Sequence, residues 1–339
     1  MSKQNVPVVT DGKTLFQGGG RWATQAMKAA ALSGKALSAS MLRTLDTLRH
    51  EEWKFFDDAL VAEAVIRLVG VADLIGAGLV RPVSNALGKT VFGYEKVTDM
   101  DPALTSLDGL ARSGNDVQEF SLNQIPLPIT HKDFFINLRT LAASREKGEA
   151  LDTTNVRTAG RVVAEQLENM LFNGGPSFGG LPIYGYRTHP DRNTAAFGTG
   201  GDWGQGAKTG EQILTDLQTM KTGLHADRMF GPYWVYVPAD AAVKLDGDFK
   251  ANSDKTIRQR LEEVDGILGV RVADQLATSQ VLLVQATMDT AAWVQGESIQ
   301  TVEWDEYGGF QINFKAFAIG VPLIRSDSDG RSGVFHMSD

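Results

Sequence analysis

The sequence predicts an α+β fold with one long helix, several paired strands and an extended segment that has no core of its own. The helix is expected over residues 152–173, where apolar side chains recur at helical spacing. Glycine and proline punctuate residues 76–124, and a coreless stretch of that length is uncommon in a compact domain. Long strands are expected over residues 298–304 and 310–324. Together these features favour a structural scaffold.

The helix over residues 152–173 has both of its ends marked. Asp152, Thr153 and Thr154 can accept hydrogen bonds from the free N–H groups of a first turn, and Asn173–Gly175 is a suitable C-cap. One apolar stripe runs along the helix, so we expect it to be a buried structural spine. The stripe consists of Val156, Ala159, Val163, Leu167, Met170 and Leu171.

The segment before this helix predicts a long two-stranded ribbon that reaches away from the body. Alternating residues favour short strands over residues 90–94 and 117–122. Aromatic side chains on these strands, Phe92, Tyr94 and Phe120, are candidates for contacts between subunits.

The first 50 residues differ in composition from the rest of the chain. A glycine hinge at Gly18–Gly20 precedes an alanine-rich stretch over residues 23–39, which has helix propensity but little to bury. We therefore expect an N-terminal arm held by neighbouring subunits, with Trp22 as a fourth candidate contact. A helix packed on its own domain is the alternative. The arm carries seven basic residues (Lys3, Lys13, Arg21, Lys28, Lys35, Arg43 and Arg49) and two acidic ones (Asp11 and Asp46).

Two further regions complete the expected elements. A first amphipathic helix is expected over residues 47–69. A second, more compact unit follows the spine, and its expected elements are helix 211–224, buried strand 233–237, helices 239–244 and 255–265, and strand 281–285.

Composition excludes several classes of protein. The chain has 339 residues, a net charge of −8 and no cysteine, so disulfides, thiolate catalysis and cysteine zinc sites are excluded. The negative net charge does not favour binding to nucleic acid. Neither a secretory signal nor a membrane span is expected, because the most apolar run, Leu60–Val80, is broken by charged residues. We expect an intracellular protein when it is made.

Motifs that carry chemistry are incomplete. Gly201–Thr209 comes within one residue of a phosphate-binding loop, but Ala207 separates the lysine from the last glycine. The five histidines are scattered, and Asp327–Gly330 lacks the later glutamate of a calcium loop. We therefore expect no catalytic residue, no cofactor and no metal, and a protein that is not an enzyme.

The order of elements resembles the HK97-type shell proteins, which are the tailed-phage major capsid proteins and the related encapsulins. The similarity covers residues 51–327. The segments that carry it are Glu52–Asp57 in the first helix, Ile125–Pro128 and Asp133–Ile136 after the extended segment, Asp152–Asn173 with its Leu-Phe-Asn-Gly ending, Gly231–Val237, Gly269–Val272 and Phe310–Ile324.

The resemblance implies an HK97-like capsid fold with six parts. These are an N-terminal arm (residues 1–50), the first helix and connection of a peripheral domain (51–84), an extended loop (85–122), a peripheral domain with the spine helix (123–210), an axial domain (211–292), and C-terminal strands that return to the peripheral domain (293–339).

The function that it implies is that of a major capsid protein. Such a protein self-assembles in the host cytoplasm into the icosahedral head of a tailed bacteriophage and becomes part of the virion. Its partners would be itself, as hexamers and pentamers, a separate scaffold protein, a portal and packaged double-stranded DNA contacted non-specifically, with no membrane. A decoration protein is a further partner that the resemblance allows. The alternatives are an encapsulin-like nanocompartment that holds cargo enzymes and an α+β enzyme with an unrecognised site.

Overall fold

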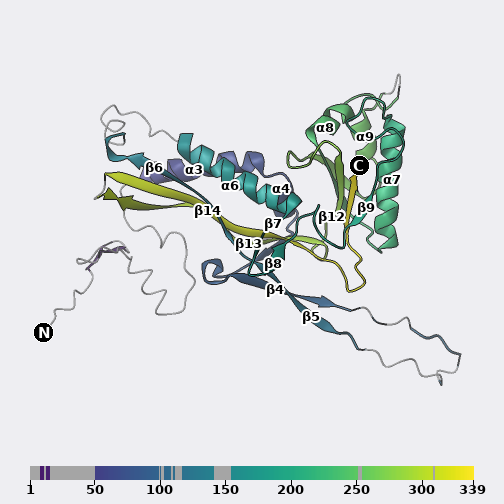
Figure 1. Ribbon diagram of the computed structural model, residues 1–339, viewed down its shortest axis with the longest axis horizontal. Coiled ribbons are helices and arrows are strands. Elements are labelled where there is room, and N and C mark those ends of the chain that lie inside the picture. The colour runs from purple at the N-terminus through teal and green to yellow at the C-terminus, as the bar shows by residue number, and fades with distance from the viewer. Residues whose placement is uncertain are drawn as a thin grey trace.

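The computed structural model describes residues 8–10, 13–15, 50–98, 100, 103–107, 110, 117–140, 154–250, 254–307 and 310–339. They form two units, each built on a sheet, and a ribbon that projects from the body (Figure 1). Most of the expected N-terminal arm, including Trp22, lies outside the described residues. Its described part is a hairpin of β1 (Val8–Thr10) and β2 (Lys13–Leu15).

The first unit is a four-stranded sheet with helices over one face (Figure 1). The strand order is β3 (Val80–Pro82), β13 (Ala291–Glu306), β14 (Gln311–Ile324) and β6 (Ile129–Asn137). The helices are α3 (His50–Arg67), α4 (Gly70–Gly76) and α6 (Thr154–Asn173). Because β13 and β14 pair antiparallel over almost their whole length, they form the long axis of the unit.

Helix α6 buries one stripe against this sheet and against α3. Val156, Val163, Leu167 and Met170, the expected spine residues, are all buried, and α6 begins at Thr154. Gly160 allows the close approach of α3, because a Cβ there would lie 3.0 Å from the carbonyl oxygen of Leu60.

The second unit is a five-stranded sheet flanked by three helices. The strand order is β11 (Ile267–Val272), β10 (Tyr233–Val237), β12 (Gln280–Gln285), β15 (Val334–Ser338) and β9 (Asn193–Ala195). The helices are α7 (Gly210–Ala226), α8 (Ala239–Leu245) and α9 (Ile257–Glu262).

Strand β10 lies between two apolar clusters. Successive side chains of a strand point to opposite faces of the sheet. Tyr233, Val235 and Val237 join the cluster under α7, α8 and α9, whereas Trp234 and Tyr236 join the cluster that contains the spine helix. Burial on both faces explains why this run is continuously apolar in the sequence.

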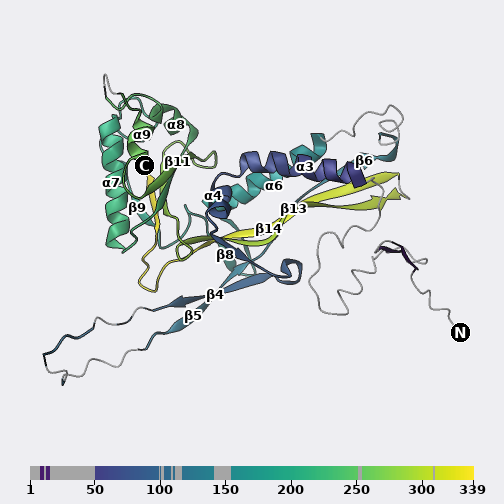
Figure 2. The ribbon, with the colours of Figure 1, turned by 180° about the vertical axis from the view of Figure 1, so that it is seen from behind.

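The expected ribbon is present. β4 (Val91–Val97) and β5 (Phe120–Pro126) pair antiparallel, from Val91 opposite Pro126 to Val97 opposite Phe120. The pair points away from both units, as seen from either side (Figures 1 and 2). A third apolar cluster lies under its root, where η1 (Ala86–Gly88) and the hairpin of β7 (Gly175–Phe178) and β8 (Leu181–Ile183) also lie.

The C-terminal segment differs from what the sequence predicts. We expected all of residues 293–339 to return to the unit of the spine helix, but β15 pairs with β12 in the other sheet. The chain reverses after β14 because the Asp327 carboxylate accepts a hydrogen bond from the Arg331 backbone at 2.7 Å. Phe335 and Met337 then bury their side chains in the cluster under the helices of the second unit.

Glu168 is a buried carboxylate that ties the spine helix to α4. Its two oxygens accept hydrogen bonds from the backbone N–H groups of Gly70, at 2.6 Å, and Val71, at 3.2 Å. Burial raises the pKa of this carboxyl from 4.5 to about 7, the backbone hydrogen bonds oppose that rise, and the nearby Asp73 charge adds to it. The ionised form is therefore held at a cost in stability.

We predict that this cost appears as a pH dependence of folding. Above pH 4.5 the unfolded chain releases the Glu168 proton while the folded chain keeps it until pH is near 7. The free energy of unfolding should therefore fall across that interval by about 3 kcal/mol from this group alone. Urea unfolding of unassembled Glu168→Gln subunits between pH 4 and pH 8 should lack this fall. The matched control is Glu165→Gln, a half-exposed carboxylate on the same helix. Parallel curves for the parent and Glu168→Gln would refute the assignment.

Candidate functional site

The β4–β5 ribbon is the candidate functional site, because it exposes apolar side chains and unpaired strand edges. A two-stranded hairpin is marginally stable by itself in water, and open strand edges readily pair with another chain. Phe120 is 65% exposed and Leu122 is 67% exposed on β5. Beyond the strands, Leu104, Leu107, Leu110 and Val117 are also exposed. Exposed apolar surface of this kind marks an interaction site.

The expected intersubunit residues fall into two groups. Phe92 and Tyr94 are partly buried and pack against the third apolar cluster at the root of the ribbon. Phe120 lies at the outer end of the paired strands and is exposed. The root aromatics therefore anchor the ribbon to its own body, whereas the Phe120 side chain is left exposed.

A cavity with both polar and apolar walls lies beside the root of the ribbon. Its volume is ≈ 380 Å³, and its walls include Tyr94, Lys96, Tyr184, His189 and Asp191. Burial lowers the pKa of His189 to about 4, so this imidazole is neutral at neutral pH. A hydrogen bond from Ser326 holds the pKa of Asp191 below its ordinary value. The cavity wall therefore combines one cation, one anion and a neutral imidazole.

A second exposed apolar surface lies between α3, α4 and β13. Leu60 and Ala64 of α3 are buried, but Val61, Val65 and Ile75 remain 43–60% exposed. They line a groove of ≈ 340 Å³ that also includes Ile299 and part of Trp293. The sequence pattern does not predict this groove, because the apolar residues of α3 and α4 are those expected of ordinary buried helix faces.

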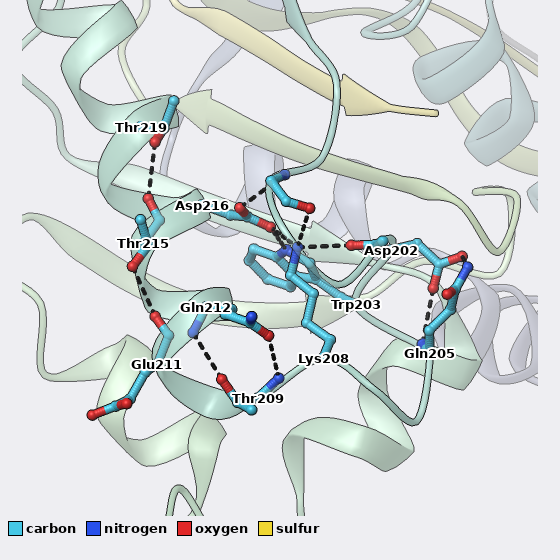
Figure 3. Close-up of polar contacts among 12 residues, drawn as sticks. Asp202, Trp203, Gln205, Lys208, Thr209, Glu211, Gln212, Thr215, Asp216 and Thr219 are labelled. Atoms are coloured by element: carbon cyan, nitrogen blue, oxygen red, sulfur yellow. Dashed lines mark hydrogen bonds and ion pairs between the residues drawn. The ribbon is translucent and has the colours of Figure 1, made fainter.

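The loop that approaches a phosphate-binding motif has a structural role (Figure 3). Lys208 is fully buried, and its Nζ lies 2.6 Å from Asp216 Oδ2 of α7. The same ammonium group donates a hydrogen bond to the Gly201 carbonyl oxygen at 2.7 Å, and Trp203 Nε1 donates to Asp216 at 2.9 Å. The lysine is thus occupied inside the protein and does not present its charge to a phosphate.

Sequence reasoning missed this cluster, although one signal was present. Asp216 stands beside Ile213, Leu217 and Met220 on the buried face of α7. A carboxylate on an apolar face indicates a buried partner, because an unpaired buried charge is strongly destabilising. The loop over residues 196–209 is therefore fixed to the second unit by one ion pair and its hydrogen bonds.

Within the described ranges, no group of three or more histidine or acidic side chains is arranged to hold a metal ion. In the same part of the chain, no helix is long and apolar enough to cross a membrane. The arrangement on which function can be built is thus a pair of sheet-based units with a projecting ribbon and exposed apolar surface.

The fold is similar to that of solved shell particles. The virus-like particle of Pyrococcus furiosus matches 85% of this chain and 100% of its own, with a TM-score of 0.59 and 13% identity. The capsid of Myoviridae phage XM1 matches 79% of this chain and 92% of its own, with a TM-score of 0.58 and 12% identity. The capsid of an empty GTA particle matches 89% and 99%, with a TM-score of 0.57 and 14% identity. The chain has the HK97-like α+β fold of shell proteins, as expected.

Sequence comparison places the chain in a family. Residues 42–337 match a family of unknown function, DUF6260, and the chain belongs to it. The type 1 encapsulin shell protein EncA of Myxococcus xanthus (strain DK1622) is 24% identical over 239 residues, which cover 69% of this chain and 71% of that protein.

We predict that Lys208→Met destabilises the second unit by about 3–5 kcal/mol, because it leaves the buried Asp216 carboxylate without its cationic partner. Chemical denaturation of the unassembled subunit measures this loss. Lys250→Met is the matched control, since the Lys250–Glu211 pair is more than half exposed and should be worth at most about 1 kcal/mol. Equal effects of the two substitutions would show that the buried pair has no special weight.

Proposed function

We propose that this chain is the subunit of a closed icosahedral shell, and specifically the major capsid protein of a tailed bacteriophage. The single observation that carries the proposal is the β4–β5 ribbon, which projects from an HK97-like body and whose described residues beyond the paired strands include exposed apolar side chains. The role of the ribbon is structural, and it binds another copy of the same chain. The head encloses double-stranded DNA, and the subunits form hexamers and pentamers in the host cytoplasm.

The ribbon supports self-association for an energetic reason. Four exposed side chains beyond the paired strands, Leu104, Leu107, Leu110 and Val117, remain in water in the single subunit. Burial of apolar surface contributes about 25 cal/mol per Å², and each of these side chains gains from it only in an assembly. A ribbon laid over the adjacent subunit would also satisfy its open edges by strand pairing.

We assign the parts of the subunit accordingly. The first unit, with α3, α6 and the β13–β14 pair, is the peripheral domain, and the five-stranded unit is the axial domain. The expected boundary at residue 211 moves toward the N-terminus in this assignment, because β9 at Asn193–Ala195 already belongs to the five-stranded sheet. The N-terminal arm, a separate scaffold protein, a portal and a decoration protein remain part of the proposal.

The charge of the chain fits an inner wall that faces DNA. A net charge of −8 avoids a strongly basic lining, which would hold the incoming DNA through its phosphates. Contact with the packaged DNA is then weak and independent of its sequence.

A second candidate function is an encapsulin-like nanocompartment that holds cargo enzymes. The observation that favours it is the 24% identity to the Myxococcus xanthus encapsulin shell protein. The two functions differ in what the particle contains. Nuclease-protected double-stranded DNA in particles from the native source supports the phage head, and a co-purified enzyme in place of DNA supports the nanocompartment.

We predict that shortening the ribbon abolishes assembly and leaves the fold intact. Replacing residues 98–119 by Asn-Gly joins Val97 to Phe120, which already face each other, through a dipeptide that favours a two-residue turn. None of the described residues in the deleted stretch belongs to the three apolar clusters, so circular dichroism and unfolding should match the parent. Electron microscopy should show no closed particles.

The boundaries of this deletion matter. Removal of the whole expected loop, residues 85–122, would also take away Ala86, Phe92 and Tyr94, which pack in the third cluster. A full-length variant with serine at Leu104, Leu107, Leu110 and Val117 is the control, because it keeps ribbon length and removes apolar contact. Normal shells from the shortened chain would overturn the proposed role of the ribbon.

A further inference from the structure

We propose that Lys96, Asp191, Arg325 and Ser326 form a latch that holds the β4–β5 ribbon at one angle to the body, and that this angle sets the geometry of assembly. The inference rests on the proposed shell function, which it deepens by naming the residues that position the ribbon. The four residues come from three distant parts of the chain: β4, the loop before β9 and the segment after β14.

The first half of the latch is a directed chain of polar contacts. Lys96 Nζ donates a hydrogen bond to Ser326 Oγ at 3.1 Å, and Ser326 Oγ donates to Asp191 Oδ2 at 2.5 Å. Lys96 Nζ also lies 3.6 Å from the same carboxylate oxygen. The lysine side chain is 24% exposed and the aspartate side chain is 33% exposed, so water screens this chain of contacts only in part.

The second half of the latch holds the neighbouring residues of the same strand. Arg325 Nη2 donates a hydrogen bond to the carbonyl oxygen of Glu95 at 2.7 Å, and its guanidinium lies 5.9 Å from the ring centre of Tyr94. Three consecutive residues of β4 are thus tied to the two residues that follow β14 and to Asp191. Lys96, Asp191 and Ser326 all line the cavity beside the ribbon root.

The position of these contacts gives them leverage. Lys96 lies five residues beyond Val91 at the root, about 17 Å at about 3.3 Å per residue, so a rotation of about 10° at the root would move Lys96 by about 3 Å and break its contacts. The apolar contacts of Phe92 and Tyr94 bury surface at the root but are non-directional. Hydrogen bonds depend strongly on angle, and the latch therefore supplies the directional constraint.

The first test measures the angle of the ribbon without reference to assembly. Because the chain has no cysteine, spin labels can be placed at Glu119→Cys, beside the ribbon strands, and at Gln218→Cys on α7. Labelled chain is diluted into unlabelled chain so that distances within one subunit dominate. We expect a single narrow distance distribution in the parent and a broadened, shifted one in Lys96→Glu and in Asp191→Lys.

The charge-exchanged double variant, Lys96→Glu with Asp191→Lys, should recover the narrow distribution, since it restores an attractive pair at the same place. Such a recovery would show that the broadening in the single variants comes from loss of the Lys96–Asp191 contact and not from misfolding. Lys89→Glu is the matched control, because it makes the same charge change at an exposed lysine just before β4. A distribution in Lys96→Glu as narrow as in the parent would overturn the latch.

The second test reads the consequence for the particle. Electron microscopy of assembled protein should show uniform shells for the parent and for the double variant, and irregular or open particles for each single variant. If the parent forms no shells, the proposed function fails, while the label distances still test the latch. If the single variants have broadened distances and yet form uniform shells, the ribbon angle does not set particle geometry.

Discussion

The double-sided burial of β10 is the constraint on which the rest of the fold depends. One face of this strand packs under the helices of the second unit, and the other face places Tyr236 against the end of the spine helix. The Tyr236 ring lies 5.1 Å from Phe172 of α6 and 6.1 Å from Tyr186. Because three residues of β10 belong to one cluster and two to the other, the two units cannot separate without exposing both cores.

The ribbon lies largely outside this joined body. The third cluster stops at Phe92, Tyr94 and Ile125, and the paired strands beyond them have apolar side chains in water. The ion pairs of the body and of the ribbon differ in burial in the same way. Lys208 and its partner Asp216 are buried, whereas Lys96 and its partner Asp191 are partly exposed.

The sequence predicted elements well where one period dominated. The spine stripe of α6, the continuous run of β10 and the alternating strands of the ribbon each follow a single repeat, and each appears within a few residues of its expected place. The short strands β9 and β15 were not expected, because three to five residues carry little periodic signal and their place is decided by pairing with distant strands.

The candidate site was predicted in outline for the same reason. Phe120, Phe92 and Tyr94 share one strand pair, yet the core that separates Phe92 and Tyr94 from Phe120 comes from β8, β13 and β14. The latch could not be foreseen, because Lys96 and Ser326 are 230 residues apart and neither stands in a motif. Polar contacts between distant surface residues leave no pattern in a single sequence.

The strength of the latch suits a subunit that must fill more than one kind of position. In the proposed shell, hexamers and pentamers would place identical chains at different angles to their neighbours, so the ribbon would need a default direction that an interface can override. The partly exposed ion pair of the latch contributes about 1 kcal/mol or less, and its hydrogen bonds contribute about 1 kcal/mol each, so together they favour one direction in the free subunit. Burial of a single large apolar side chain from the ribbon contributes about 1.5–3 kcal/mol and therefore exceeds it. A buried pair such as Lys208–Asp216 at the root would hold the ribbon in one position, and an apolar contact alone would give it no preferred angle.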